Sequence, residues 1–332
     1  MSVPSQPLPA DGVYDPTALV DALAAAPSVH NTQPWRVRRI DGGLQLRADT
    51  RRRLPAADRT ARELRISCGA GLMNMRLAMA AAGRRPVVRL LPDASDPAVL
   101  ATIHRGELAE PTPEELRLNA VVPVRRSYRR PFSELPVAPL HRHLLRRAAE
   151  REGAWLHGVD SRQEQGRLRT LLVAAHRAQR ADPGFVLEWE TWTGRPDGER
   201  IGVPLRSAGP PPAGNDMWMV RDFTHSWSPD EDARQEQEEF DPAPLVLVLC
   251  THHDMPVAHL SAGQALQRVL LTATALGLSS SVLSAPVEVD DTRRQLRRFV
   301  GPEVHPQILV RVGHGDVVPD GAPRLGSSQL WG

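Results

Sequence analysis

The chain has 332 residues, enough for about two domains of ordinary size. Its 41 Lys+Arg and 39 Asp+Glu leave a formal net charge of +2, which provides no field for gathering nucleic acid, and two cysteines exclude a disulfide scaffold. No apolar run approaches the length of a membrane span, and the N-terminal residues lack the regions of a secretion signal. We therefore expect a cytoplasmic protein that binds neither membrane nor nucleic acid.

The first half of the chain, residues 16–122, is expected to follow a disordered tail over residues 1–15 and to mix helices with strands. Its apolar periodicity and its Pro and Gly positions predict, in order, a helix at 15–26, a polar turn or short helix at 27–33, a hairpin of strands at 35–40 and 44–48, a long helix at 59–82, a strand at 86–91, and short helices at 96–104 and 113–121.

The second half, residues 123–332, predicts helices at 136–151 and 162–180, a strand at 245–251, a helix at 257–276, a strand at 279–283, a helix at 292–299 and a strand at 307–312. It also contains a long insertion at 202–244 that is rich in Pro, Gly and acidic residues and carries Trp218, Phe223 and Trp227. A loop of this length in a compact domain is usually a functional lid or disordered. The three aromatic residues favour a lid rather than a disordered linker, because disordered linkers seldom carry several large aromatic side chains.

Two segments repeat each other at an offset of 194 residues. Residues 67–92 and 261–286 match without a gap at eight of 26 positions, including Gly69 with Gly263, Gly83 with Gly277 and Pro92 with Pro286. Two unrelated helices rich in Ala and Leu are the alternative interpretation. The matched glycines and prolines favour a duplication, and they predict two related halves folded against each other, like a homodimer fused into one chain.

The sequence APSVHNTQPW at 26–35 places a hydroxyl, an imidazole and two amides within six residues. Ser28, His30 and Asn31 are therefore candidates for hydrogen bonding to a heteroaromatic ligand with alternating donors and acceptors. A turn or helix cap, in which these side chains satisfy the backbone before Pro34, explains the pattern equally well.

The sequence RRSYRRPF at 125–132 is a candidate anion site, because forked guanidiniums match a phosphomonoester. Arg125, Arg126, Ser127 and Arg129 belong to it, and a solvated basic linker is the alternative. The sequence PQILVRVG at 306–313 predicts a strand in which Arg311 stands among apolar residues, so it is either a buried cation with a partner or a residue of the strand edge. The histidines lack the spacing of metal ligands, and no metal site is expected.

Taken together and in this order, the PSVHNTQPW block, the RRSYRRPF block, the helix SAGQALQRVLLTATALGL and the PQILVRVG strand resemble the nitroreductase-like flavoproteins, most closely their two-halved Acg-type branch. The resemblance spans roughly residues 15–315. It implies an α+β nitroreductase-like fold, in which two related halves, each with a mainly antiparallel sheet and long central helices, are fused as a pseudo-dimer.

The resemblance also implies that one FMN lies between the halves. The first half lacks the arginine block and the second lacks the PSVHN block, so one site per chain is expected, and a monomer is sufficient to form it. By this resemblance, Arg125 and Ser127 would hold the phosphate with Arg311 assisting, and Arg126 of the same block would also bind the cofactor. Arg129 would lie at the N1/O2 edge of the flavin. The opposite half would supply Ser28, His30 and Asn31 to line the ring and the ribityl chain, and Gln264 would contact the ring.

The function implied by the resemblance is an FMN-dependent oxidoreductase. A nicotinamide, NADH or NADPH, would reduce the flavin, and a small electron-poor acceptor such as a nitro compound or a quinone would reoxidise it. The flavin carries this chemistry, so no catalytic side chain is required. The alternative is a protein that binds and stores FMN with little turnover, which a lid at 202–244 would favour.

Overall fold

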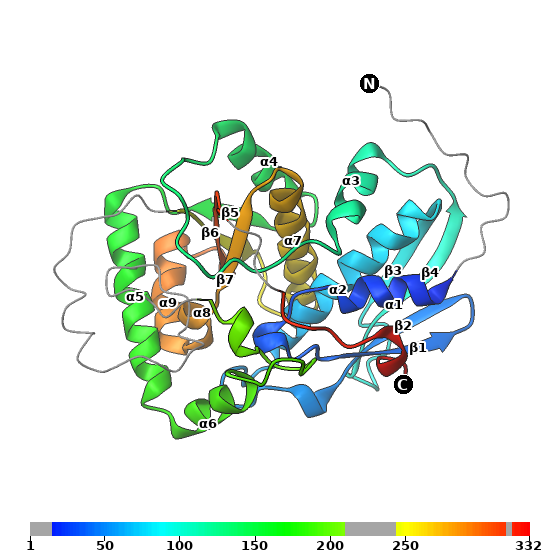
Figure 1. The fold of residues 1–332 in the computed structure, drawn as a ribbon, viewed down its shortest axis with the longest axis horizontal. Helices are drawn as coiled ribbons and strands as arrows, with labels where there is room; N and C mark the ends of the chain where they lie inside the picture. The colour runs from blue at the N-terminus through cyan, green and yellow to red at the C-terminus, as the bar shows by residue number, and fades with distance from the viewer. Residues whose placement is uncertain (1–14, 210–243, 317–320) are drawn as a thin grey trace.

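The computed structural model describes residues 15–209, 244–316 and 321–332. Two antiparallel sheets lie on either side of a central pair of long helices, α2 (Arg62–Ala81) and α7 (Pro256–Ala275) (Figure 1). The first sheet has the strand order β1-β2-β4-β3 and the second has the order β5-β6-β8-β7. The strands are β1 (Trp35–Ile40), β2 (Gly43–Ala48), β3 (Arg84–Leu90), β4 (Val99–Leu108), β5 (Trp155–Gly158), β6 (Leu245–Thr251), β7 (Ser279–Leu283) and β8 (His305–Gly313).

Most of the expected elements form close to their predicted bounds. The helix predicted at 162–180 and the strands predicted at 245–251 and 279–283 have these bounds in the structure. The remaining helices are α1 (Pro16–Ala24), α3 (Pro113–Val121), α4 (Pro139–Glu150), α5 (Arg162–Arg180), α6 (Pro183–Trp192), α8 (Ala285–Glu288) and α9 (Asp290–Val300).

The helix predicted at 96–104 is wrong, because these residues belong largely to strand β4. β4 lies inside the first sheet and pairs with β2 on one side and β3 on the other. Both faces of its first half are covered, so Val99 to Thr102 are buried in succession and give a continuous apolar run without the alternation of a half-exposed strand. Strand β5 and helix α6 were not predicted at all.

The predicted repeat has a counterpart in the topology. Helices α2 and α7 are both 20 residues long and are offset by 194 residues at each end. Gly83 and Gly277 follow them with φ values of +75° and +73°, a conformation that glycine adopts without strain. The next strand of each half, β3 or β7, then forms the edge of its sheet. The two halves thus share one arrangement, while their origin by duplication stays a prediction.

Helices α2 and α7 cross at two glycines that are partners in the repeat. A Cβ added to Gly69 would overlap the carbonyl oxygen of Leu260, and a Cβ added to Gly263 would overlap that of Ile66. Since Ile66 and Leu260 are also offset by 194 residues, the contact is reciprocal, as at the two-fold axis of a symmetric dimer. In the interior next to this crossing, Gln267 Nε2 donates a hydrogen bond of 2.7 Å to Asn74 Oδ1.

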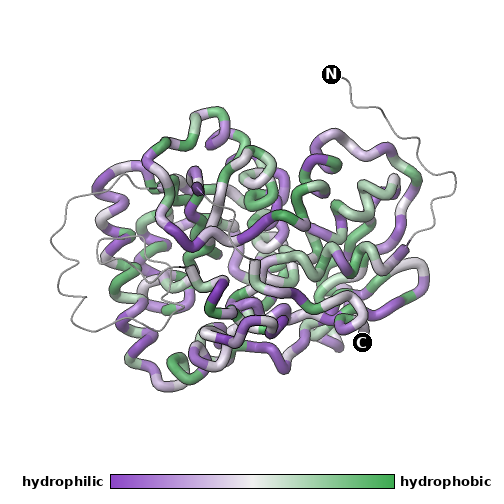
Figure 2. The backbone as a smooth tube through the Cα atoms, viewed as in Figure 1, coloured by the Kyte–Doolittle hydropathy of each residue, from purple (hydrophilic) through white to green (hydrophobic). Residues whose placement is uncertain are grey.

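Each sheet packs its own hydrophobic core against one central helix, the first against α2 and the second mainly against α7. Figure 2 shows hydrophobic and hydrophilic residues alternating along the peripheral helix α5, which buries Leu168, Leu172 and Ala175. The C-terminal segment, residues 321–332, departs from a simple division into halves. It returns to the first sheet, where Val37 N donates to Leu330 O at 2.8 Å.

We expect the crossing to tolerate no side chain at Gly69 or Gly263. Gly69→Ala or Gly263→Ala should lower the free energy of unfolding by about 1–3 kcal/mol, because backbone rather than a flexible side chain blocks the added methyl group. Gly166→Ala in α5, where nothing lies within 4 Å of the added Cβ, is the matched control and should stabilise the protein by up to about 1 kcal/mol. Urea unfolding measures all three, and equal midpoints would contradict the close crossing.

Candidate functional site

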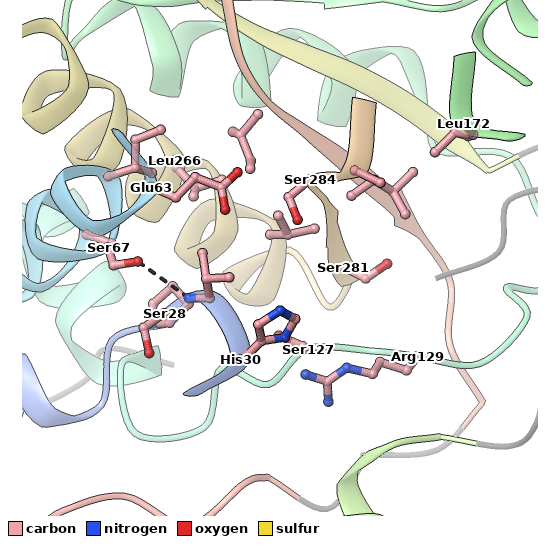
Figure 3. Close-up of a pocket in the computed structure, with 18 of the residues that line it drawn as sticks. Ser28, His30, Glu63, Ser67, Ser127, Arg129, Leu172, Leu266, Ser281 and Ser284 are labelled. Atoms are coloured by element: carbon pink, nitrogen blue, oxygen red, sulfur yellow. Dashed lines mark hydrogen bonds between the residues drawn. The ribbon is translucent and has the colours of Figure 1, made fainter. Parts of the chain in front are cut away.

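A cavity lies between the two halves, beside the central helices, and contains about 900 Å³ of empty space, part of it open to solvent. Figure 3 shows side chains from the first turn region, from α2 and from the second half pointing toward one another across it. The polar lining residues are Ser28, His30, Glu63, Ser67, Ser127, Arg129, His176, Ser281 and Ser284.

The turn at Val29–Asn31 places Ser28 and His30 on the cavity wall. His30 and Asn31 have φ values of +47° and +55°, which residues other than glycine seldom adopt. Hydrogen bonds from backbone N–H groups of the turn to two serine hydroxyls hold this conformation: Gln33 N donates to Ser28 Oγ at 2.9 Å and Val29 N donates to Ser67 Oγ in α2 at 3.4 Å. Ser28 therefore supports its own turn as well as lining the cavity.

The two amides of the turn contact backbone from the second half. Asn31 Nδ2 donates to Gly202 O at 2.9 Å and to Pro323 O at 3.0 Å. Gln33 Nε2 donates to Arg200 O at 2.6 Å, and Gln33 Oε1 accepts from Leu325 N at 2.9 Å. These bonds match the interpretation in which the amides satisfy backbone groups, although the backbone belongs to distant segments. Asn31 is outside the cavity lining, and its role toward a ligand stays a prediction.

The basic block runs along the edge strand β7, where Tyr128 N donates to Ser280 O at 2.8 Å. The segment is thus anchored rather than a solvated linker. Ser127 and Arg129 line the cavity (Figure 3), and Arg125 is buried beside them with 2% of its surface exposed. Arg126 is exposed and donates to Pro123 O at 2.7 Å.

Arg324 joins this cluster and was missed by sequence reasoning. Arg324 lies on the C-terminal segment that returns to the first half, and its guanidinium donates a hydrogen bond to Asn31 Oδ1. Burial, and then the neighbouring cations of Arg125, Arg126 and Arg129, lower the pKa of Arg324 to about 9. A single arginine in a loop gives no signal in the sequence, because only the folded chain brings it to the others.

Arg125, Arg126, Arg129 and Arg324 form an arginine cluster, in which burial and then the charges of the other three lower the pKa of Arg324. Burial followed by the charges of Arg126 and Arg129 lowers the pKa of Arg125 to about 10, and burial lowers that of Arg129 to about 10. In the part of the chain that the structure describes, no carboxylate pairs with Arg125, Arg126 or Arg324, and no acceptor reaches Arg125 Nε. Guanidiniums stay protonated at neutral pH, so the cluster favours an anion.

Arg311 and Gln264 are buried near the cavity but are not among the residues that line it. Arg311 in β8 is 1% exposed, donates from Nε to Ser281 Oγ at 3.0 Å, and has its guanidinium 5.2 Å from the ring centre of Phe132. Of the two interpretations of Arg311, a buried cation or a residue of the strand edge, the structure therefore supports the buried cation. Gln264 in α7 accepts a hydrogen bond of 2.8 Å from Arg76, whereas its repeat partner Ala70 lines the cavity.

The predicted lid residues Trp218, Phe223 and Trp227 lie outside the described residues, so a lid stays a prediction. At the start of the insertion, Ser207 O accepts a hydrogen bond from Arg129. In the described ranges, no cluster of three or more His, Cys, Asp or Glu side chains could hold a metal ion. None of the helices in those same ranges has both the length and the hydrophobicity that crossing a bilayer requires.

Comparison with known proteins assigns the family. The model of the Nitroreductase family matches residues 124–314. A Mycobacterium tuberculosis protein named "Putative NAD(P)H nitroreductase" is 34% identical over 90% of this chain and 84% of its own length. Another from that organism, "Putative NAD(P)H nitroreductase acg", is 33% identical over 89% of this chain and 87% of its own length. The chain belongs to the nitroreductase family, which confirms the family and the α+β fold expected from the sequence.

Similarity to solved structures is weaker. A nitroreductase with bound FMN from Bacteroides fragilis aligns with a TM-score of 0.37 and 14% identity, over 65% of this chain and 96% of that chain. Nitroreductase A from Vibrio parahaemolyticus aligns with a TM-score of 0.39 and 13% identity, over 64% of this chain and 72% of that chain.

We expect inorganic phosphate to stabilise the protein by binding the arginine cluster. Phosphate at a hundredfold excess over its Kd should add about 2.7 kcal/mol to the free energy of unfolding. Arg125→Gln and Arg324→Gln should reduce this gain. Arg38→Gln, which changes an exposed arginine of β1, should preserve it. Thermal unfolding with and without phosphate measures the gain, and an equal gain in all the variants would contradict the anion site.

Proposed function

We propose that this protein is an FMN-dependent oxidoreductase that passes reducing equivalents from NAD(P)H to a small electron-poor acceptor. Membership in the nitroreductase family supports the reaction class. The observation that carries the cofactor is the arginine cluster beside a largely apolar cavity, because FMN combines a phosphomonoester with a flat apolar ring. Neither feature alone would distinguish FMN from an ordinary anion or an ordinary apolar ligand.

The residues present fit FMN. Arg125 Nε is buried without an acceptor in the described part of the chain, and a phosphate oxygen would supply one. We assign the phosphate to Arg125, Ser127 and Arg324, with Arg126 and Arg311 adding positive charge nearby. The flavin ring would lie between Ile66, Leu266, Leu283 and Ile308, which form apolar parts of the wall.

FMN, when bound, accepts a hydride from a reduced nicotinamide and returns two electrons to the acceptor. The chain's own residues position the cofactor and tune its charge. The apolar wall excludes water from the ring, and the Arg129 cation on the same wall stabilises negative charge that develops on reduction. Ser28 and His30, from the first half, line the same cavity as Ser127 and Arg129 of the basic block, which supports a contact of both halves with the cofactor.

A second candidate function, storage of FMN without turnover, has one observation in its favour. Three polar side chains of the cavity are nearly inaccessible, with exposed fractions of 7% for His30, 4% for Ser67 and 2% for Glu63. A nicotinamide must reach the flavin ring through such a wall. Storage therefore predicts flavin that is bound tightly and reduced slowly.

The visible spectrum of the protein separates these functions. Purified protein loaded with FMN should bleach when NADPH or NADH is added under nitrogen, and a nitroaromatic or quinone should restore the colour. Arg125→Ala combined with Ser127→Ala should lose about 1.5–3 kcal/mol of FMN binding per charge-assisted contact and release the flavin on dialysis. Flavin that stays oxidised with both nicotinamides supports storage, and flavin retained by the double variant contradicts the phosphate assignment.

We expect one chain to form a complete site. Ser28 and His30 from the first half and Ser127 and Arg129 from the second line the same cavity, so a partner chain is not needed to bring them together. Light scattering after size exclusion should find FMN in a peak of monomer mass at micromolar concentration. FMN confined to a dimer peak would show that a second chain contributes to the site.

A further inference from the structure

The side chain of Asn31 has no hydrogen-bond donor left for a cofactor. It donates to Gly202 O at 2.9 Å and to Pro323 O at 3.0 Å, and a primary amide has only two protons to donate. Asn31 is also buried, with 4% of its surface exposed, and it is not among the residues that line the cavity. Asn31 could therefore donate to a flavin ring or a ribityl chain only by breaking one of these bonds.

The oxygen of the same side chain holds an arginine. Asn31 Oδ1 accepts a hydrogen bond from Arg324, which makes no other hydrogen bond or ion pair among the residues that the structure describes. A guanidinium has five N–H donors, so Arg324 can bind Asn31 and still donate to an anion. Burial and then the charges of the other arginines of the cluster lower the pKa of Arg324 to about 9. The bond from Arg324 to Asn31 thus holds a cation in place against the repulsion of its neighbours.

The C-terminal segment, residues 321–332, connects the arginine cluster to the first sheet. Figure 1 shows this segment, drawn in red, running from the centre of the molecule to the side on which the first sheet lies. Leu330 is fully buried in the core of the first half, and its carbonyl oxygen accepts from Val37 N of β1 at 2.8 Å. At the other end of the segment, a Cβ added to Gly321 would overlap the side chain of Arg126. The segment therefore contacts both the cluster and the core of the first half.

We propose that Asn31 is a positioning residue of the anion site, which holds Arg324 in place and acts on the anion through this arginine, so that the C-terminal segment forms one side of the site. The inference rests on the proposed function only for the identity of the anion, the phosphate of FMN. An anion that binds Arg324 together with the rest of the cluster must stabilise the docked segment. By linkage, the docked segment must strengthen anion binding by the same factor.

Removal of the Asn31 side chain tests this role with two probes, inorganic phosphate and FMN. Glycine is the suitable replacement, because the residue has a φ of +55°, which glycine adopts without strain. Asn31→Gly should raise the Kd of phosphate, measured by calorimetry, and the Kd of FMN, measured by flavin fluorescence, by the same factor of roughly three to ten, as expected for one hydrogen bond. A loss confined to FMN would show that Asn31 contacts the flavin or the ribityl chain and would overturn the proposal, as would two unchanged constants.

A double variant separates positioning from general damage to the fold. Arg324→Gln removes the cation that Asn31 holds, so adding Asn31→Gly to this variant should weaken phosphate binding no further. Losses that add in the double variant would overturn the positioning role. Arg38→Gln, which changes an exposed arginine of β1, is the control and should leave both constants unchanged.

Hydrogen exchange measured by mass spectrometry tests the docking of the C-terminal segment. Phosphate at ten times its Kd should slow exchange in residues 321–332 by up to about tenfold, and Arg324→Gln should abolish this slowing. Phosphate that binds without slowing exchange there would overturn the proposal, and a wild-type chain that binds no phosphate would overturn the anion site as well. A chain that shows all the phosphate effects but binds no FMN would overturn the proposed function and leave the role of Asn31 intact.

Discussion

The close crossing of α2 and α7 sets the separation of the two halves, and the cavity depends on that separation. Gly69 and Gly263 allow each helix backbone to lie against the other, and the overlap that a Cβ would cause leaves no freedom for the helices to move closer together. The same two helices supply parts of the cavity wall, with Ser67 and Ala70 on α2 and Leu266 on α7. A shift of the crossing would therefore move wall residues of both halves at once.

The crossing is symmetric, but the side chains around it are not. Ala70 lines the cavity, whereas at the equivalent position Gln264 accepts a hydrogen bond from Arg76. Arg76 also pairs with Glu152, which in turn pairs with Arg268, so an ion-pair network occupies that side. The two-fold arrangement of the backbone thus carries different side chains on its two sides, and one cofactor per chain stays a prediction.

Local patterns predicted most elements, and contacts between distant segments explain the failures. Helix α5 and strand β6 have strong periodic or apolar signals and were predicted at their observed bounds. In the candidate site, Ser28, His30, Ser127 and Arg129 were predicted and do line one cavity. Arg324 and Glu63 were missed because each stands in an ordinary sequence context. Arg324 reaches the site only through the returning C-terminal segment. Glu63 lies in the first turn of a helix, where an acidic residue is common whether or not it is buried.

The treatment of buried charge distinguishes the arginine cluster from the rest of the molecule. Elsewhere the chain pairs its buried cations: Arg62 contacts Glu63 at 2.9 Å and Arg268 contacts Glu152 at 2.8 Å. A buried charge without a counter-charge opposes folding, so a protein under selection for stability alone would place a carboxylate beside Arg125. Among the described residues no such carboxylate is present. The charge of Arg125 therefore supports our proposal that an anionic ligand binds beside it, and such a ligand would stabilise the folded chain when it binds.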